Sequence, residues 1–150
     1  SGDNYHRIFE PPTNYVPNPL IFYLNLIDSF DKCILITEPD RENPIVHELM
    51  KIDKVKIQSS TVADDFATLM SARNVALSGV GTFAMAAALC STRIKNLYTT
   101  NLLLTEHLNY SMMHNTDVEL HVMDLENYLP VFPCSWKNTE EQRKFILDYR

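Results

Sequence analysis

The chain has 150 residues, of which 45% are hydrophobic and 21% charged, a balance typical of a folded globular protein and not of a disordered one. Its 19 acidic and 13 basic residues give a formal net charge of −6, and Lys and Arg stand singly, which disfavours a nucleic-acid partner. No apolar run is long enough to predict a membrane-spanning helix, so we expect no membrane segment within this chain.

The N-terminal part is predicted to be an irregular arm over residues 1–19, because it is rich in proline and shows no periodicity. The length suits a single domain over residues 1–150, and the start on Ser1 in place of Met predicts a fragment of a longer chain. A first helix is expected over residues 20–30.

From residue 32 onward, apolar runs alternate with stretches of helical periodicity. Residues 32–38 contain four consecutive apolar residues, which predicts a buried strand, and Asn43 with Pro44 then predicts the start of a helix. Residues 54–59 alternate apolar and polar side chains, as in a strand nearer the sheet edge, and Ser60 or Thr61 can cap the helix that follows.

The same order continues to the C-terminus. The later predicted elements are strand 75–78, helix 82–90, strand 94–98, helix 104–113, strand 119–125 and helix 138–149, the last with capping-box spacing from Asn138. Strands that alternate with helices across short connections predict an α/β fold: an open, mostly parallel, Rossmann-like sheet with helices on both faces.

The turn over residues 78–83 is the strongest candidate for a ligand site. Two of the three glycines, Gly79 and Gly81, lie in it, between a strand and a helix. Backbone N–H groups at a helix N-terminus bind anions, so Ser78, Gly81, Thr82 and Phe83 are candidate phosphate contacts. Thr82 can equally serve only as a helix cap.

Other candidates follow the carboxyl ends of the predicted strands, where open α/β sheets bind ligands. They are Glu38 and Asp40 after the first strand and the polar residues 59–61 after the second. Turn and cap chemistry also enriches such residues, and Asp65 has the simple alternative of stabilising the first turn of its helix.

Several motifs are missing. The chain has neither GxGxxG nor GxxxxGK[ST], and no HExxH, Asp-x-Asp or GxSxG. The three cysteines show no zinc-ligand spacing, so we expect no metal site and no cofactor.

Taken in order, several segments resemble the donor-binding C-terminal half of a GT-B glycosyltransferase, specifically the fucosyltransferase-like group. Residues 1–3, ending in Asp3, are similar to the tail of its HxRxGD loop; residues 19–23 are similar to the segment that leads its first helix; and residues 37–40, Asp65 and residues 81–83 occupy corresponding places.

The resemblance implies one lobe of a GT-B fold that binds a nucleotide-sugar donor, with GDP-fucose favoured, for inverting transfer to a glycan or glycoprotein acceptor without a metal. It places the nucleoside against Asp65 and residues 38–40, and the pyrophosphate against Gly81, Thr82 and Phe83. It also implies a Golgi or secretory location.

The sequence departs from that family in two ways. The arginine of the first loop would precede Ser1, so this segment alone is expected to bind a nucleotide weakly and to catalyse little, and the acceptor half is missing. The alternative function is a non-catalytic α/β interaction domain or a degenerate fragment, whose polar loops are only solvated.

Overall fold

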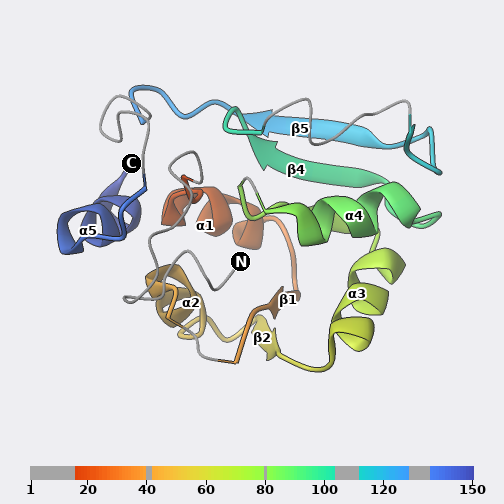
Figure 1. The fold of residues 1–150 in the computed structure, drawn as a ribbon, viewed down its shortest axis with the longest axis horizontal. Coiled ribbons are helices and arrows are strands. Elements are labelled where there is room, and N and C mark those ends of the chain that lie inside the picture. The colour runs from red at the N-terminus through yellow and green to blue at the C-terminus, as the bar shows by residue number, and fades with distance from the viewer. Residues whose placement is uncertain (1–15, 40–41, 80, 104–111, 129–135) are drawn as a thin grey trace. The chain divides into compact units, whose positions relative to one another are not determined.

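The computed structural model describes residues 16–39, 42–79, 81–103, 112–128 and 136–150 (Figure 1). Contacts divide the chain into two compact units. Unit 1 comprises Ser1–Ser59 and Asn127–Arg150, and unit 2 comprises Ser60–Glu126. In the described residues the fold is α/β, with two small sheets whose strands are all parallel.

In its described residues, unit 1 contains a two-stranded sheet and three helices. In chain order its elements are α1 (Leu20–Asp28), β1 (Cys33–Ile36), α2 (Pro44–Leu49), β2 (Val55–Gln58) and α5 (Glu140–Asp148). The two strands run parallel, with Ile36 opposite Gln58, and α5 contacts both α1 and α2. The C-terminal helix is therefore part of the same unit as the first strands.

The start of α2 confirms the sequence prediction. The Asn43 side-chain oxygen accepts a hydrogen bond from the Ile45 N–H at 2.9 Å, and Pro44 occupies the first helical position. Val46 and Leu49, on the same face as Ile45, are buried. The apolar face and the cap therefore define this helix together.

The N-terminal cap residue of α5 lies one position later than the sequence predicts. Thr139, not Asn138, is the cap: its hydroxyl accepts from the Gln142 N–H at 3.3 Å, and the Gln142 side chain accepts from the Thr139 N–H at 3.4 Å. Asn138 lies outside the helix because its backbone is left-handed, with φ 56°. The predicted capping box exists, but with different residues.

Buried aromatic rings hold unit 1 together. Tyr128 is fully buried, its hydroxyl donates to the Pro17 carbonyl at 2.7 Å, and its ring stacks on Phe145 of α5 at 5.4 Å. The described end of the predicted arm, residues 16–19, is thus irregular but buried. Residues 1–15 of that arm lie outside the described residues.

The prediction that the first strand is fully buried is wrong. Ile34 is 51% exposed, and the other three residues of β1 are half-buried. The expectation assumed a strand with neighbours on both sides and helices on both faces. In the described residues β1 pairs with β2 alone, and a two-stranded sheet covers its own strands less completely.

Unit 2 contains the longer sheet. Its elements are α3 (Val62–Ser71), β3 (Asn74–Ala76), α4 (Thr82–Cys90), β4 (Asn96–Thr100) and β5 (Glu119–Met123), with strand order β3–β4–β5. The helix expected over residues 104–113 falls almost wholly outside the described residues. We expected all the strands in one sheet, but in the described residues they form two separate sheets.

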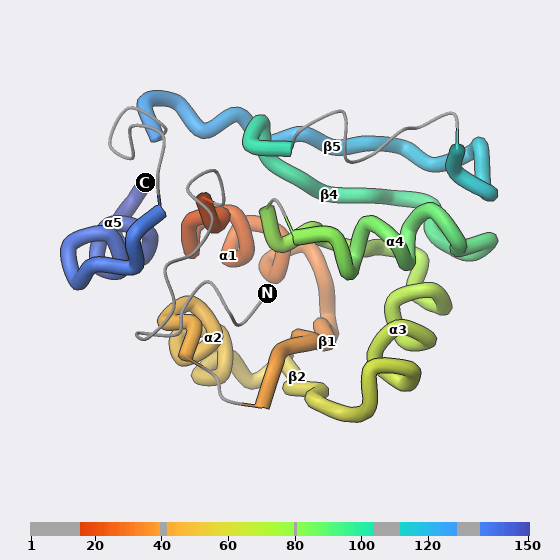
Figure 2. Tube along the Cα trace, in the orientation of Figure 1, coloured from red at the N-terminus to blue at the C-terminus, as the bar shows by residue number. Residues whose placement is uncertain are grey.

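The core of unit 2 lies between its strands and α4. Val75, Leu77 and Leu97 are buried together with Met85 and Ala88 of α4. The helices α3 and α4 pack side by side within the unit (Figure 2). This packing fixes the turn that joins β3 to α4, where the sequence places its strongest candidate site.

Candidate ligand-binding site

The turn over residues 78–83 needs a glycine at position 79. Ser78 is exposed, and Gly79 is buried with φ 95°, a left-handed value that a side chain disfavours. Gly81 has an ordinary extended backbone, with φ −70°, so its own conformation does not demand glycine. The two glycines therefore serve different purposes.

The N-terminus of α4 is open. The helix begins at Thr82, and Gly81 is its cap residue, with no side-chain cap hydrogen bond. Thr82 is thus not the cap, because it already has helical geometry. The first N–H groups of any α-helix lack partners within the helix, and in the described part of the chain no other group accepts from Gly81, Thr82 or Phe83.

Two described side chains at the start of α4 reach the surface. Thr82 is exposed, and the Phe83 ring is 40% exposed while it contacts Phe66 of α3 edge to face. The helix that presents the N–H groups is thereby tied to its neighbour. N–H groups without an acceptor at the start of a helix are the kind of donors that bind a phosphate.

Asp65 has a structural partner. It is only 8% exposed, and its two carboxylate oxygens lie 3.3 and 3.2 Å from the Ser60 nitrogen, which donates to them. Thr61, and not Ser60, caps α3 by accepting from the Asp64 N–H. Asp65 therefore fixes the chain entering α3, and a contact of Asp65 with a ligand stays a prediction.

Glu38 lies in unit 1, just after β1, and is exposed. The Thr37 N–H donates to the Gln58 carbonyl at 3.1 Å, so the parallel pairing of β1 and β2 extends to the residue before Glu38. Asp3 and Asp40 lie outside the described residues. Of the predicted site residues, Asp65, Ser78, Gly81, Thr82 and Phe83 share unit 2, and Glu38 belongs to unit 1.

One polar group of unit 1 was not singled out from the sequence. The hydroxyl of Ser59, the residue that follows β2, is buried and has no hydrogen-bond partner among the described residues. A buried hydroxyl without a partner is uncommon in folded proteins. The sequence marked residues 59–61 as polar but carried no signal of which hydroxyl is buried.

Two further observations bear on the kind of site. Within the described residues no three His, Cys, Asp or Glu side chains gather closely enough to hold a metal ion. None of the helices in the described ranges has the length and apolar character that crossing a bilayer requires.

Together the fold and the turn define an α/β protein with all-parallel strands and an open helix N-terminus beyond a strand end. Comparison of the chain with models of protein families, with curated proteins and with solved structures finds no match.

Proposed function

We propose that this chain binds a nucleotide-sugar donor, with the phosphates at the N-terminus of α4. The observation that carries the proposal is the start of α4: the N–H groups of Gly81, Thr82 and Phe83 donate to no acceptor among the described residues, and Thr82 is exposed beside them. A diphosphate supplies the charge and the acceptor oxygens that such a turn lacks.

The physical fit is to a phosphate rather than to a neutral ligand. A helix N-terminus carries the equivalent of roughly +0.5 charge, and N–H groups that point at an oxyanion need no rearrangement when the ligand arrives. The Thr82 hydroxyl adds one donor. If the donor sugar is transferred, the same groups stabilise the charge that grows on the departing diphosphate.

The nucleoside is assigned from the resemblance. Asp65 of unit 2 is proposed to face the ribose or base, and the nucleoside contact that the resemblance implies for Glu38 stays a prediction. We further propose that the fold is the Rossmann-like donor lobe of a GT-B glycosyltransferase of the fucosyltransferase type. GDP-fucose as donor, a glycan or glycoprotein as acceptor and a Golgi or secretory location all belong to this proposal.

Thermal unfolding with GDP, UDP and ADP tests the proposal. A ligand at a hundredfold excess over its Kd stabilises the native state by about 2.7 kcal/mol. We expect GDP to raise Tm most and Thr82→Ala to reduce the shift. Thr92→Ala, an exposed threonine beyond the end of α4, is the matched control and is expected to leave the shift unchanged. No shift with any of the three nucleotides at millimolar concentration contradicts donor binding.

A further inference from the structure

Three neighbouring apolar side chains of α3 and α4 are exposed or half-buried within unit 2. Val62 opens α3 and is 76% exposed, the highest fraction among the exposed large hydrophobic residues of the described ranges. Phe66 lies one turn further along the same face of α3, and its half-buried ring meets the ring of Phe83. We call the surface formed by Val62, Phe66 and Phe83 the apolar ledge.

The apolar ledge adjoins the proposed phosphate site. Phe83 is the second residue of α4 and is itself 40% exposed. Because the Cα–Cβ bonds of an α-helix tilt toward its N-terminus, the ring of Phe83 lies toward the end of α4 where the first N–H groups have no acceptor among the described residues. Single exposed apolar side chains are ordinary, whereas a cluster of them beside polar groups is typical of a binding surface.

The charges at the two helix starts differ. The first turn of α3 carries Asp64 and Asp65, and Thr61 caps it. The first turn of α4 carries no acidic residue and has no side-chain cap hydrogen bond. Carboxylates repel a phosphate, and the N-terminal end of a helix dipole attracts it. The charged part of a ligand is therefore favoured at α4, and its uncharged part toward α3, where the apolar ledge lies.

We propose that the apolar ledge binds the nucleobase of the nucleotide whose phosphates lie at the N-terminus of α4. This inference rests on the proposed function and gives the ligand one orientation within unit 2. Every nucleobase has a flat face that stacks on an aromatic ring, here that of Phe83, and inorganic pyrophosphate has none. The ledge therefore selects nucleotides over other phosphates and leaves the choice among bases to polar contacts.

The test is calorimetric titration of the full chain with GDP and, separately, with inorganic pyrophosphate. Phe83→Leu keeps an apolar side chain and removes the ring. Val62→Ser removes an exposed apolar contact, and Val122→Ser is its matched control, because Val122 of β5 is also an exposed valine of unit 2.

We expect Phe83→Leu to weaken GDP binding about fivefold, the lower end of what base stacking on an aromatic side chain contributes. Val62→Ser is expected to weaken GDP binding about threefold, because less apolar surface is buried by the base. Both variants are expected to bind pyrophosphate as tightly as the wild type. Val122→Ser is expected to change neither affinity.

Each outcome decides one question. If the wild-type chain binds neither GDP nor pyrophosphate, the proposed function fails, and the role of the apolar ledge with it. If the wild type binds GDP and both Phe83→Leu and Val62→Ser bind it equally well, the role of the ledge alone is wrong. Equal losses of GDP and pyrophosphate affinity in Phe83→Leu show that the ring only supports the helix start, and also overturn it. Should Phe83→Leu not fold, Val62→Ser decides by the same comparison.

Discussion

The ring of Phe66 in α3 meets the ring of Phe83 in α4 edge to face, with centroids 5.6 Å apart and planes at 65°. Phe83 is the second residue of α4, so this contact reaches the very turn whose N–H groups are open. The aromatic pair therefore sets the direction in which the helix N-terminus points. The proposed phosphate site would depend on this rigid support from Phe66, which lies outside it.

The pair predicts a measurable coupling between the two helices. Aromatic pairs of this geometry contribute about 0.5–1.5 kcal/mol beyond the area that they bury. We expect Phe66→Leu and Phe83→Leu each to lower the free energy of unfolding. The loss in the double variant is expected to be smaller than the sum of the two single losses by about 0.5–1.5 kcal/mol. Urea unfolding of the four proteins measures it. Strict additivity of the two losses would show that the rings do not support each other.

The two glycines of the turn predict opposite behaviour. Gly79 has φ 95°, so Gly79→Ala is expected to cost about 1–2 kcal/mol of stability. Gly81 has φ −70°, which alanine adopts freely, so Gly81→Ala is expected to lose at most about 1 kcal/mol as a poorer cap residue. Its methyl group nevertheless stands beside the open N–H groups and is expected to weaken pyrophosphate binding.

Denaturant unfolding and pyrophosphate titration of both variants check this pair. A Gly81→Ala protein that binds pyrophosphate as tightly as the wild type would place the phosphate elsewhere.

Ser59 and Ser91 form a second contrasting pair. The Ser91 hydroxyl donates to the Met70 carbonyl at 2.6 Å and accepts from the N–H groups of Arg93 and Ile94. Ser91→Ala is therefore expected to cost about 1–3 kcal/mol, because buried groups lose their partner. Ser59→Ala removes a hydroxyl that satisfies no other group, so stability is expected to stay level or rise.

Thermal melting of both variants beside the wild type measures these effects. A clear loss of stability in Ser59→Ala would contradict the absence of a partner for its hydroxyl.

Cysteine reactivity gives a prediction that depends on pH. Burial raises the pKa of the Cys33 thiol, and the nearby charge of Lys54 opposes the shift. Only the thiolate reacts, so at pH 8 Cys33 is expected to react more slowly with a disulfide reagent than the exposed Cys90. The folded chain holds the Cys33 proton more tightly than the unfolded chain. Its contribution to stability is therefore present at neutral pH and is lost as pH rises above the unfolded pKa of about 8.5.

Absorbance kinetics in a Cys134→Ser background follow the two thiols, with Cys33→Ser and Cys90→Ser assigning the phases. Faster labelling of Cys33 than of Cys90 would be incompatible with its partial burial.

Local signals predicted the helices well and the sheets poorly. Both ends of α4 were predicted correctly, because the signals that set them lie within a few residues of the helix: Gly81, Thr82 and the apolar run that follows. Among the described residues β1 pairs with β2 alone, and this could not be predicted, since strand partners far apart in the chain are set by tertiary packing. The apolar run of β1 therefore suggested burial that Ile34 does not have.

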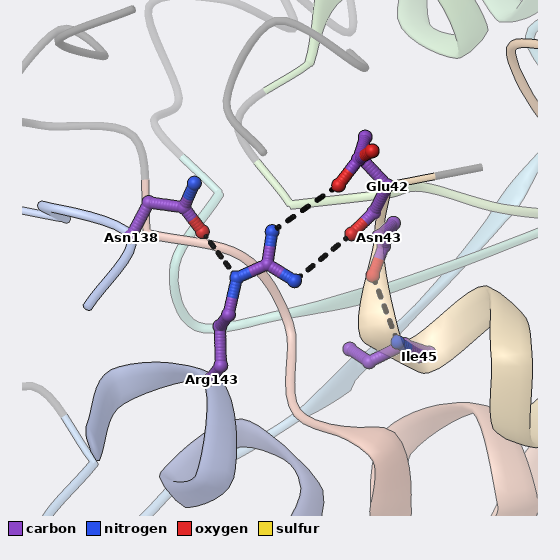
Figure 3. Close-up of polar contacts among 5 residues, drawn as sticks. All are labelled: Glu42, Asn43, Ile45, Asn138 and Arg143. Carbon is purple, nitrogen blue, oxygen red and sulfur yellow. Dashed lines mark hydrogen bonds and ion pairs between the residues drawn. The ribbon is translucent and has the colours of Figure 1, made fainter. Parts of the chain in front are cut away.

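The cap of α5 shows the same limit on a smaller scale. Asn138 and Thr139 are both good cap residues, and their sequence spacing to Glu141 and Gln142 is equivalent. The contact of Asn138 with Arg143 (Figure 3) accompanies its left-handed backbone, which leaves Thr139 as the cap. The start of α4 at Thr82 was predictable from the local pattern, whereas the orphan hydroxyl of Ser59 depends on burial that no local pattern encodes.

The most direct test of the central claim is an amide-resolved titration. Pyrophosphate and then GDP are added to the ¹⁵N-labelled chain, and the ¹H–¹⁵N resonances are followed. Binding of the phosphates at the N-terminus of α4 predicts the largest shifts at Gly81, Thr82 and Phe83 with both ligands. Saturable binding that leaves these three amides unshifted, or no binding at millimolar ligand, would contradict the proposal.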